Sequence, residues 1–127
     1  CYEVAFAREI HRDLPEAVLL VNVSNDAWFG DSIGPHQHLQ LARARARESG
    51  RWLARSTNTG ITAIVDFEGN VRSRIPQFEA GTLVGAVELR DGATPYVRWG
   101  DWPIVVLAMV TLVGIWWVSQ RSIRRRA

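Results

Sequence analysis

Apolar positions in the first part of the chain follow two different spacings. Through residues 2–14 they recur every three to four positions, with charged residues elsewhere around the axis, which predicts an amphipathic helix that ends before Pro15. Residues 17–23 (AVLLVNV) are instead continuously apolar and rich in β-branched side chains, as is typical of a strand buried on both faces. A helix that leads into such a strand favours an α/β layer structure.

A polar loop follows at residues 24–35, rich in glycine, asparagine, aspartate and serine, and it carries Trp28 and Phe29. Because α/β folds often place their binding and catalytic sites on loops at strand ends, these two aromatic side chains are candidates for substrate binding. The alternative, that they cap the core, is equally compatible with the sequence. Residues 36–49 then predict a second helix, with Gly50 as its C-terminal stop.

Short β-rich runs predict further strands. The runs span residues 52–57, 61–67, 71–75 and 82–89. The Gly69-Asn70 dipeptide predicts a tight hairpin between the second and third of these runs.

An uncharged run of 19 residues occupies positions 102–120. As a helix it would measure about 28 Å, close to the thickness of the hydrocarbon core of a bilayer. A membrane span is favoured over a buried core helix, because the run is apolar on all faces and the rest of the chain is too small to enclose it. Four arginines in residues 121–127 should stay in the cytoplasm, which places residues 1–101 in the periplasm of a Gram-negative cell.

Charge and cysteine content argue against several kinds of partner and site. Residues 1–120 carry 11 Arg against 13 acidic residues, so the net charge of +2 comes from the tail and no nucleic-acid surface is implied. All 15 basic residues are arginine, and the chain contains no lysine. A single cysteine excludes an internal disulfide and a paired-cysteine zinc site.

That single cysteine is Cys1, at the start of the first predicted helix. The N–H groups and dipole of a helix N-terminus can make a thiol reactive and can hold an oxyanion, so Cys1 is a candidate nucleophile. An inert cysteine and the lipid-modified first residue of a mature lipoprotein are the alternatives. Glu3 is a poor direct base for Cys1, because side chains two positions apart on a helix do not face each other, and a supporting role fits it better.

Two polar groups on the second predicted helix favour structural interpretations. His36 and His38 form an H-x-H pair, but no third ligand is evident, so neither a metal nor another cofactor is expected. Arg43, Arg45 and Arg47 spread around the helix and are expected to form a solvated face.

The order of motifs resembles that of one known family. The motifs are CYE at a helix start, SNDAWFG, GPHQHLQLARARARE, RSTNTGITAIVDFEG, IPQF and TPYVRWGDWP before the final apolar run. Together they resemble the C-terminal portion of the apolipoprotein N-acyltransferase family, bacterial inner-membrane members of the nitrilase (carbon-nitrogen hydrolase) superfamily. The resemblance covers essentially the whole chain, which makes it far more specific than a lone cysteine.

The resemblance implies an α/β fold, the C-terminal part of a nitrilase-like α-β-β-α sandwich followed by one transmembrane helix. It divides the chain into a periplasmic catalytic part (1–101), a transmembrane helix (102–120) and a basic cytoplasmic tail (121–127). The family's catalytic glutamate and lysine lie upstream of the cysteine. The upstream part of the same enzyme is therefore an expected partner, and residues 1–127 alone are expected to be inactive.

In this family a cysteine takes an acyl group from a phospholipid as a thioester and passes it to the α-amine of diacylglyceryl-cysteine in an apolipoprotein. The resemblance makes Cys1 the nucleophile and Tyr2 and Glu3 its supporting residues. The substrate-binding residues that it implies lie on one loop and are Asn25, Asp26, Trp28 and Phe29. The expected partners are a phospholipid donor, an apolipoprotein acceptor and the bacterial inner membrane.

Two other functions remain open on the sequence. One is a nitrilase-type amidase anchored in the membrane, which would use the same nucleophile on a small amide. The other is a non-catalytic, membrane-anchored periplasmic module. The uncharged run and the tryptophan-bearing loop favour a lipid substrate.

Overall fold

A computed structural model describes residues 3–124, except for the side chains of residues 118, 120 and 122–124. The chain consists of two compact units, Cys1–Val97 and Arg98–Ala127. Cys1 and Tyr2 lie outside the described residues.

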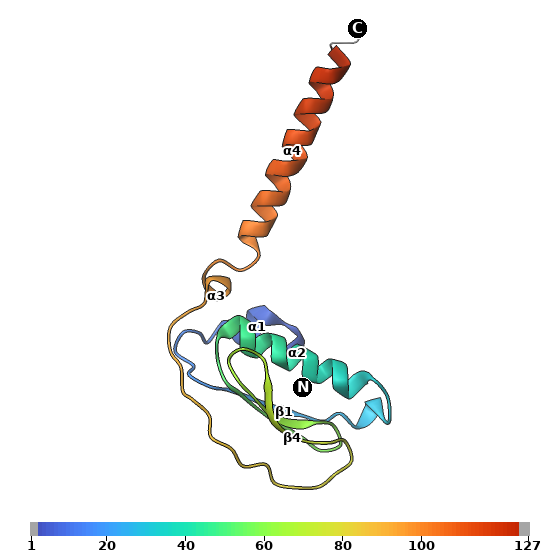
Figure 1. Cartoon of the computed structure of the whole chain (residues 1–127), viewed down its shortest axis with the longest axis vertical. Helices are drawn as coiled ribbons and strands as arrows, with labels where there is room; N and C mark the ends of the chain where they lie inside the picture. The colour runs from blue at the N-terminus through green and yellow to red at the C-terminus, as the bar shows by residue number, and fades with distance from the viewer. Residues whose placement is uncertain (1–2, 125–127) are drawn as a thin grey trace. The chain divides into compact units, whose positions relative to one another are not determined.

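Four strands form one mixed sheet in the first unit, in the order β1-β2-β3-β4 (Figure 1). Strand β1 (Leu20–Ser24) runs parallel to β2 (Leu53–Thr57), while β3 (Thr62–Val65) and β4 (Val71–Ile75) follow as antiparallel neighbours. A parallel pair needs a long crossover, and helix α2 (Gly34–Ser49) supplies it. The α/β class expected from the sequence is thereby confirmed.

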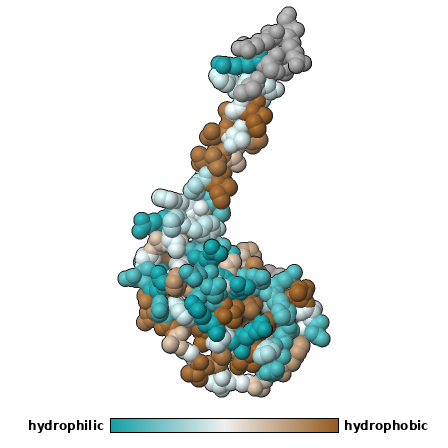
Figure 2. All heavy atoms as spheres, in the orientation of Figure 1, coloured by the Kyte–Doolittle hydropathy of each residue, from teal (hydrophilic) through white to brown (hydrophobic). Residues whose placement is uncertain are grey.

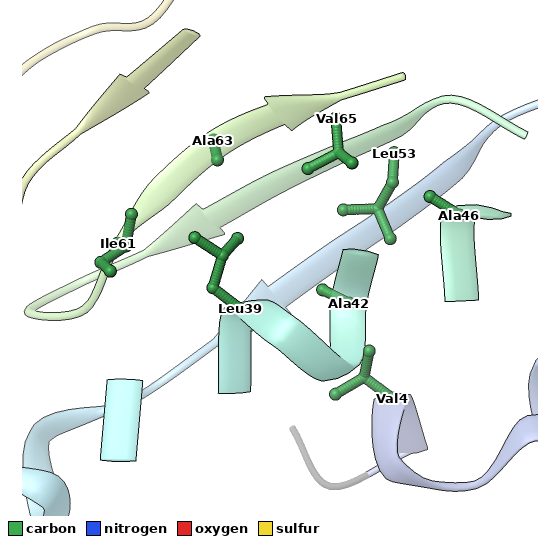
Figure 3. Close-up of a cluster of buried hydrophobic side chains, with 8 residues drawn as sticks. All are labelled: Val4, Leu39, Ala42, Ala46, Leu53, Ile61, Ala63 and Val65. Carbon is green, nitrogen blue, oxygen red and sulfur yellow. The ribbon is translucent and has the colours of Figure 1, made fainter. Parts of the chain in front are cut away.

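The core lies between α2 and one face of the sheet. Its buried side chains are Val4, Leu39, Ala42, Ala46, Leu53, Ile61, Ala63 and Val65. Figure 3 shows the side chains of α2 pointing toward those of the strands. Leu53 and Val65 are partners in the β2-β3 ladder, so both lie on the same face, and the small Ala42 and Ala46 let the helix approach it closely.

The first predicted helix is interrupted. A 3₁₀ turn, η1 (Glu3–Ala5), and a short helix, α1 (Ala7–His11), are separated by Phe6, whose backbone is extended at φ −106° and ψ 101°. Within these two elements only Val4 is fully buried. Apolar spacing alone therefore does not maintain one continuous helix over residues 2–14.

The strand expected at 17–23 forms at Leu20–Ser24, but it is not buried on both faces. Val21 and Val23 are each 71% exposed, because nothing in the described part of the chain covers that face of β1. The strand expected at 82–89 does not form, and Gly85 of this segment lies over Ile64 of β3. A Cβ on Gly85 would lie 2.7 Å from Cδ1 of Ile64.

The second helix and the three strands after it are confirmed, with ends shifted by a few residues. Gly50 ends α2 in the left-handed conformation, at φ 67°, where glycine is favoured. Gly69 occupies the β3-β4 turn at φ 84°. Asp66 closes this turn, because its Oδ1 accepts hydrogen bonds from the backbone N–H groups of Glu68 at 2.9 Å and Asn70 at 2.8 Å.

The second unit contains α4 (Trp102–Arg124), a helix of 23 residues. Apolar side chains are exposed along it, among them Leu107 at 67% and Ile115 at 63% (Figure 2). Within the described residues, however, no helix combines the length and the apolar character that a membrane crossing requires. The span over 102–120 stays a prediction.

Candidate functional site

A cavity of about 490 Å³ opens beside the loop that follows β1. Its lining comes from η1, this loop and the first half of α2, and consists of Ala5, Asn25, Trp28, Phe29, Gly34, Gln37, His38 and Leu41. Apolar side chains with a few polar groups among them are typical of small-molecule sites. The cavity is therefore the candidate site in the first unit.

Trp28 and Phe29 reach the cavity from a 3₁₀ turn, η2 (Ala27–Phe29). Trp28 is 86% exposed, so it does not cap the core. The ring of Phe29 meets the His38 ring edge-on, with centroids 6.1 Å apart. Gly34 makes room for this arrangement, since a Cβ there would lie 2.5 Å from Cδ1 of Phe29.

Directly behind this wall lies a buried cluster of polar side chains centred on Asp26, whose side chain has no exposed surface. Its Oδ1 accepts a hydrogen bond from Oγ of Ser24 at 2.8 Å and lies 2.8 Å from Nδ1 of His38. Its Oδ2 accepts one from Nη2 of Arg55, also at 2.8 Å. The cluster thus joins the end of β1, the loop, α2 and β2.

Arg55 is as deeply buried as Asp26 and uses all three of its nitrogens. Nε donates to the carbonyl of Ile61 at 3.3 Å, and Nη1 donates to Oδ1 of Asn22. Nη2 lies 3.1 Å from Nδ1 of His38 besides bonding Asp26. A buried charge is tolerated only when it is paired and hydrogen-bonded in this way.

The electrostatics fix the charge state of the pair. Burial alone would raise the pKa of the Asp26 carboxyl, but hydrogen bonds from Ser24 and His38 and the charge of Arg55 outweigh it, so this pKa lies below its ordinary value. Burial lowers the pKa of Arg55, and Asp26 offsets part of that effect. Asp26 is therefore an anion at neutral pH, which suits it to positioning other groups and not to donating a proton.

The loop between β2 and β3 completes the cluster. The backbone N–H of Asp26 donates to Oδ1 of Asn58 at 3.3 Å. Gly60 packs so closely that a Cβ there would lie 2.2 Å from Oδ2 of Asp26. Any other residue at position 60 would displace the carboxylate.

Comparisons with known proteins place this chain in a family. Residues 1–94 match the carbon-nitrogen hydrolase family. The chain belongs to the carbon-nitrogen hydrolases. Its four-stranded sheet and covering helix are consistent with that fold, and the resemblance found in the sequence is confirmed.

Several curated relatives carry the name apolipoprotein N-acyltransferase. The one from Methylococcus capsulatus is 50% identical over 95% of this chain and 24% of its own length. The relative from Azotobacter vinelandii is 47% identical over 100% of this chain and 24% of its own length. The relative from Nitrosomonas europaea is 51% identical over 89% of this chain and 22% of its own length. This carbon-nitrogen hydrolase chain thus spans about a quarter of the length of these relatives.

The structure brings together several of the residues expected at the site. Asn25, Trp28 and Phe29 line the cavity, whereas Asp26 is buried behind its wall. Glu3 lies in η1, exposed, two residues before Ala5 in the lining. The roles expected of Cys1 and Tyr2 fall outside the described residues, so they stay predictions.

Sequence reasoning missed the two side chains that partner Asp26. His38 was expected to be structural and not a metal ligand, without a named partner, and Arg55 was not singled out, because an arginine in a β-rich run can equally face solvent, as Arg72 does. No group of three histidine, cysteine, aspartate or glutamate side chains suited to a metal occurs among residues 3–124 as far as they are described.

The expectation of a solvated arginine face on α2 is wrong for two of its three members. Nε of Arg43 donates to the carbonyl of Gly69 at 2.7 Å, because the β3-β4 turn packs against the helix. Arg45 is buried and forms an ion pair with Glu48 at 2.9 Å. Arg47 alone of the three is exposed.

Proposed function

We propose that this chain is part of a membrane acyltransferase that moves a fatty acyl group from a phospholipid to the N-terminal amine of diacylglyceryl-cysteine in apolipoproteins. One observation carries the proposal. The relative from Azotobacter vinelandii matches 100% of the chain, whereas the match to the hydrolase family ends at residue 94. The likeness to proteins named apolipoprotein N-acyltransferase therefore extends beyond the shared hydrolase domain, which favours acyl transfer over simple amide hydrolysis.

The proposed chemistry has two steps. The thiolate of Cys1 attacks the ester carbonyl of the phospholipid, a thioester forms and the lysophospholipid leaves as an alcohol. The free amine of the acceptor then attacks the thioester, an amide forms and the thiol is regenerated. Tyr2 and Glu3 support the nucleophile in this scheme, and the cavity walls at Trp28 and Phe29 offer apolar surface to an acyl chain.

The proposed location is the bacterial inner membrane. We assign residues 102–120 to the span, residues 1–101 to the periplasm and residues 121–127 to the cytoplasm. The exposed apolar side chains along α4 and the four arginines of residues 121–127 support this assignment.

A chimera tests the activity. Residues 1–127 would replace the matching segment of the Methylococcus capsulatus relative, and transfer of a labelled acyl group from phospholipid to a diacylglyceryl peptide would be measured. We expect transfer, a hydroxylamine-sensitive acyl adduct on Cys1 by mass spectrometry, and loss of both in Cys1→Ala. The unmodified relative is the positive control.

Other outcomes would replace the proposal. Hydrolysis of small amides without acyl transfer would identify a membrane-anchored amidase. Absence of both adduct and turnover, with the unmodified relative active, would identify a non-catalytic module. Residues 1–127 alone are expected to show no transfer, because no lysine is present and Glu3 is poorly placed as a base.

A further inference from the structure

We propose that the start of α4 binds a phospholipid, whose phosphodiester group lies at Arg98 and whose acyl chain lies along one face of the helix. The site lies entirely within the second unit. It rests on the proposed membrane location of α4 and assigns a lipid-binding position there.

A hollow of about 480 Å³ lies where α3 (Pro95–Trp99) is followed by α4. One arginine, two tryptophans, a proline and a valine line it, namely Arg98, Trp99, Trp102, Pro103 and Val106. The side chain of Trp99 is 62% exposed and that of Trp102 is 72% exposed. Large apolar side chains that gather at a surface mark contact with another molecule or with a membrane.

Arg98 determines which chemical group the hollow suits. Its side chain is exposed, and it forms no ion pair or hydrogen bond within the described part of the chain. Among the described residues no carboxylate belongs to the lining, and Asp101 lies outside it. A guanidinium donates two parallel hydrogen bonds to a phosphate group, and the indole N–H of tryptophan is a further donor. The charge and the donors of the hollow therefore complement a phosphate group.

The face of α4 that continues from this hollow favours a lipid over a free phosphate. Positions 102, 106, 109, 113 and 117 are spaced by three or four residues, so they lie on one side of the helix. A second hollow, of about 550 Å³, follows along the helix and is lined by Met109, Val110, Val113, Gly114 and Trp117. Between positions 102 and 117 the helix measures about 22 Å, at 1.5 Å per residue. This side offers apolar surface to an acyl chain that extends from Arg98 (Figure 2).

Native mass spectrometry of the 127-residue chain, released from detergent micelles, measures the binding. The probe is phosphatidylcholine, which carries a phosphodiester but no net charge, so a general attraction between arginines and an anionic lipid does not contribute. Diacylglycerol with the same acyl chains lacks the phosphate headgroup. We expect phosphatidylcholine to bind about tenfold more tightly than diacylglycerol, the worth of one charge-assisted hydrogen bond. Equal affinities would overturn the proposal.

Arg98→Gln should weaken the binding of phosphatidylcholine about tenfold, to the level of diacylglycerol. Arg98→Lys should retain part of the affinity, because an ammonium keeps the charge but cannot bind a phosphate in the bidentate geometry. Arg47→Gln is the matched control, since it removes one exposed arginine from α2 in the first unit. Equal weakening in Arg98→Gln and Arg47→Gln would contradict a specific site at α4.

Excess inorganic phosphate separates the two sources of the phosphate group. It lacks an acyl chain, so we expect it to leave bound phosphatidylcholine in place. Displacement of the lipid would identify a site for free phosphate and would overturn the lipid assignment.

Photo-crosslinking of the chimera identifies what occupies the hollow in a full-length enzyme. Benzoylphenylalanine would replace Trp99, and the chimera would be illuminated in phosphatidylcholine nanodiscs. We expect a lipid adduct that decreases several-fold when Arg98→Gln is added. A crosslink to the upstream part of the enzyme or to a second copy, in place of the lipid, would overturn the proposal. An inactive chimera that still yields the lipid adduct would refute the proposed activity but not the site.

Discussion

Oδ2 of Asp26 lies 2.8 Å from Nη2 of Arg55, and neither side chain has any exposed surface. Asp26 belongs to the loop that carries Trp28 and Phe29, and Arg55 belongs to β2. The ion pair therefore fastens the wall of the cavity to the sheet. Loss of either partner would leave the other charge buried without a counter-charge, which is far more costly than the loss of an exposed pair.

Arg55→Met should lower the free energy of unfolding by about 3 kcal/mol or more, because it leaves the Asp26 carboxylate without its cation. Arg72→Met is the matched control, since Arg72 pairs with the equally buried Asp66 at 2.7 Å, but the Arg72 side chain is 58% exposed and Asp66 keeps its hydrogen bonds from Glu68 and Asn70. The loss of Arg72 should therefore cost less than the loss of Arg55. Denaturant unfolding followed by circular dichroism measures the free energy of unfolding of both variants. Equal decreases in the two variants would contradict a larger contribution from the buried Asp26–Arg55 pair.

Acid should destabilise the fold through Asp26. Its pKa in the folded chain lies below the value of about 3.9 for an unfolded chain, so its contribution is complete above that pH and is lost as the pH falls through the folded value. In Asp26→Asn the unfolding free energy should therefore fall less steeply below about pH 4, by up to ~1.4 kcal/mol per pH unit. Unfolding curves between about pH 5 and pH 2 measure the slopes, and identical slopes would contradict this prediction.

His11 should give a second pH dependence, nearer neutrality. Burial lowers its pKa and the charge of Arg45 lowers it further, while Glu48 faces its Nε2 at 3.9 Å. Its contribution to stability is thus present above about pH 6.5, the value for an unfolded chain, and is lost as the pH falls toward the folded value. His11→Phe keeps a ring against Tyr96 but cannot titrate, so thermal melts should show a flatter profile just below pH 6.5. An unchanged profile would count against His11.

Gly60→Ala should disturb the cluster without touching a charge. The new Cβ would lie 2.2 Å from Oδ2 of Asp26, an overlap that overpacked sites relieve at a cost of about 1–3 kcal/mol. Gly114→Ala in α4 is the control, since a Cβ there meets nothing within 4 Å and alanine favours a helix. Thermal unfolding should distinguish the two, and the prediction fails if Gly60→Ala melts like the unmodified chain.

Reporter fusions should place the C-terminus in the cytoplasm. Alkaline phosphatase fused after Ala127 is expected to be inactive and a cytoplasmic fluorescent reporter active, because the arginines of residues 121–127 resist translocation. Replacing these arginines with serine should weaken the preference. Phosphatase activity from the Ala127 fusion would overturn the orientation, and recovery of the fusion from the soluble fraction would overturn the membrane span.

The sequence by itself determined the features that local chemistry encodes. The apolar periodicity and Gly50 identified α2, and Gly69-Asn70 located the β3-β4 turn, because a left-handed backbone favours glycine whatever surrounds it. The order of motifs identified the family, and the aromatic loop pointed to the cavity wall. Apart from the order of motifs, each of these signals lies within a short stretch of chain.

Only the tertiary structure decided which distant residues meet. Asp26 and Arg55 are 29 residues apart, and they come together because β1 pairs with β2 in a register that sets Asn22 opposite Arg55. Burial of a charge depends on a partner that no local pattern names, so Arg55 could not be recognised from its own strand. Val21 is exposed for a similar reason. An apolar run predicts side chains that favour burial, but whether they are buried depends on which other parts of the fold pack against them.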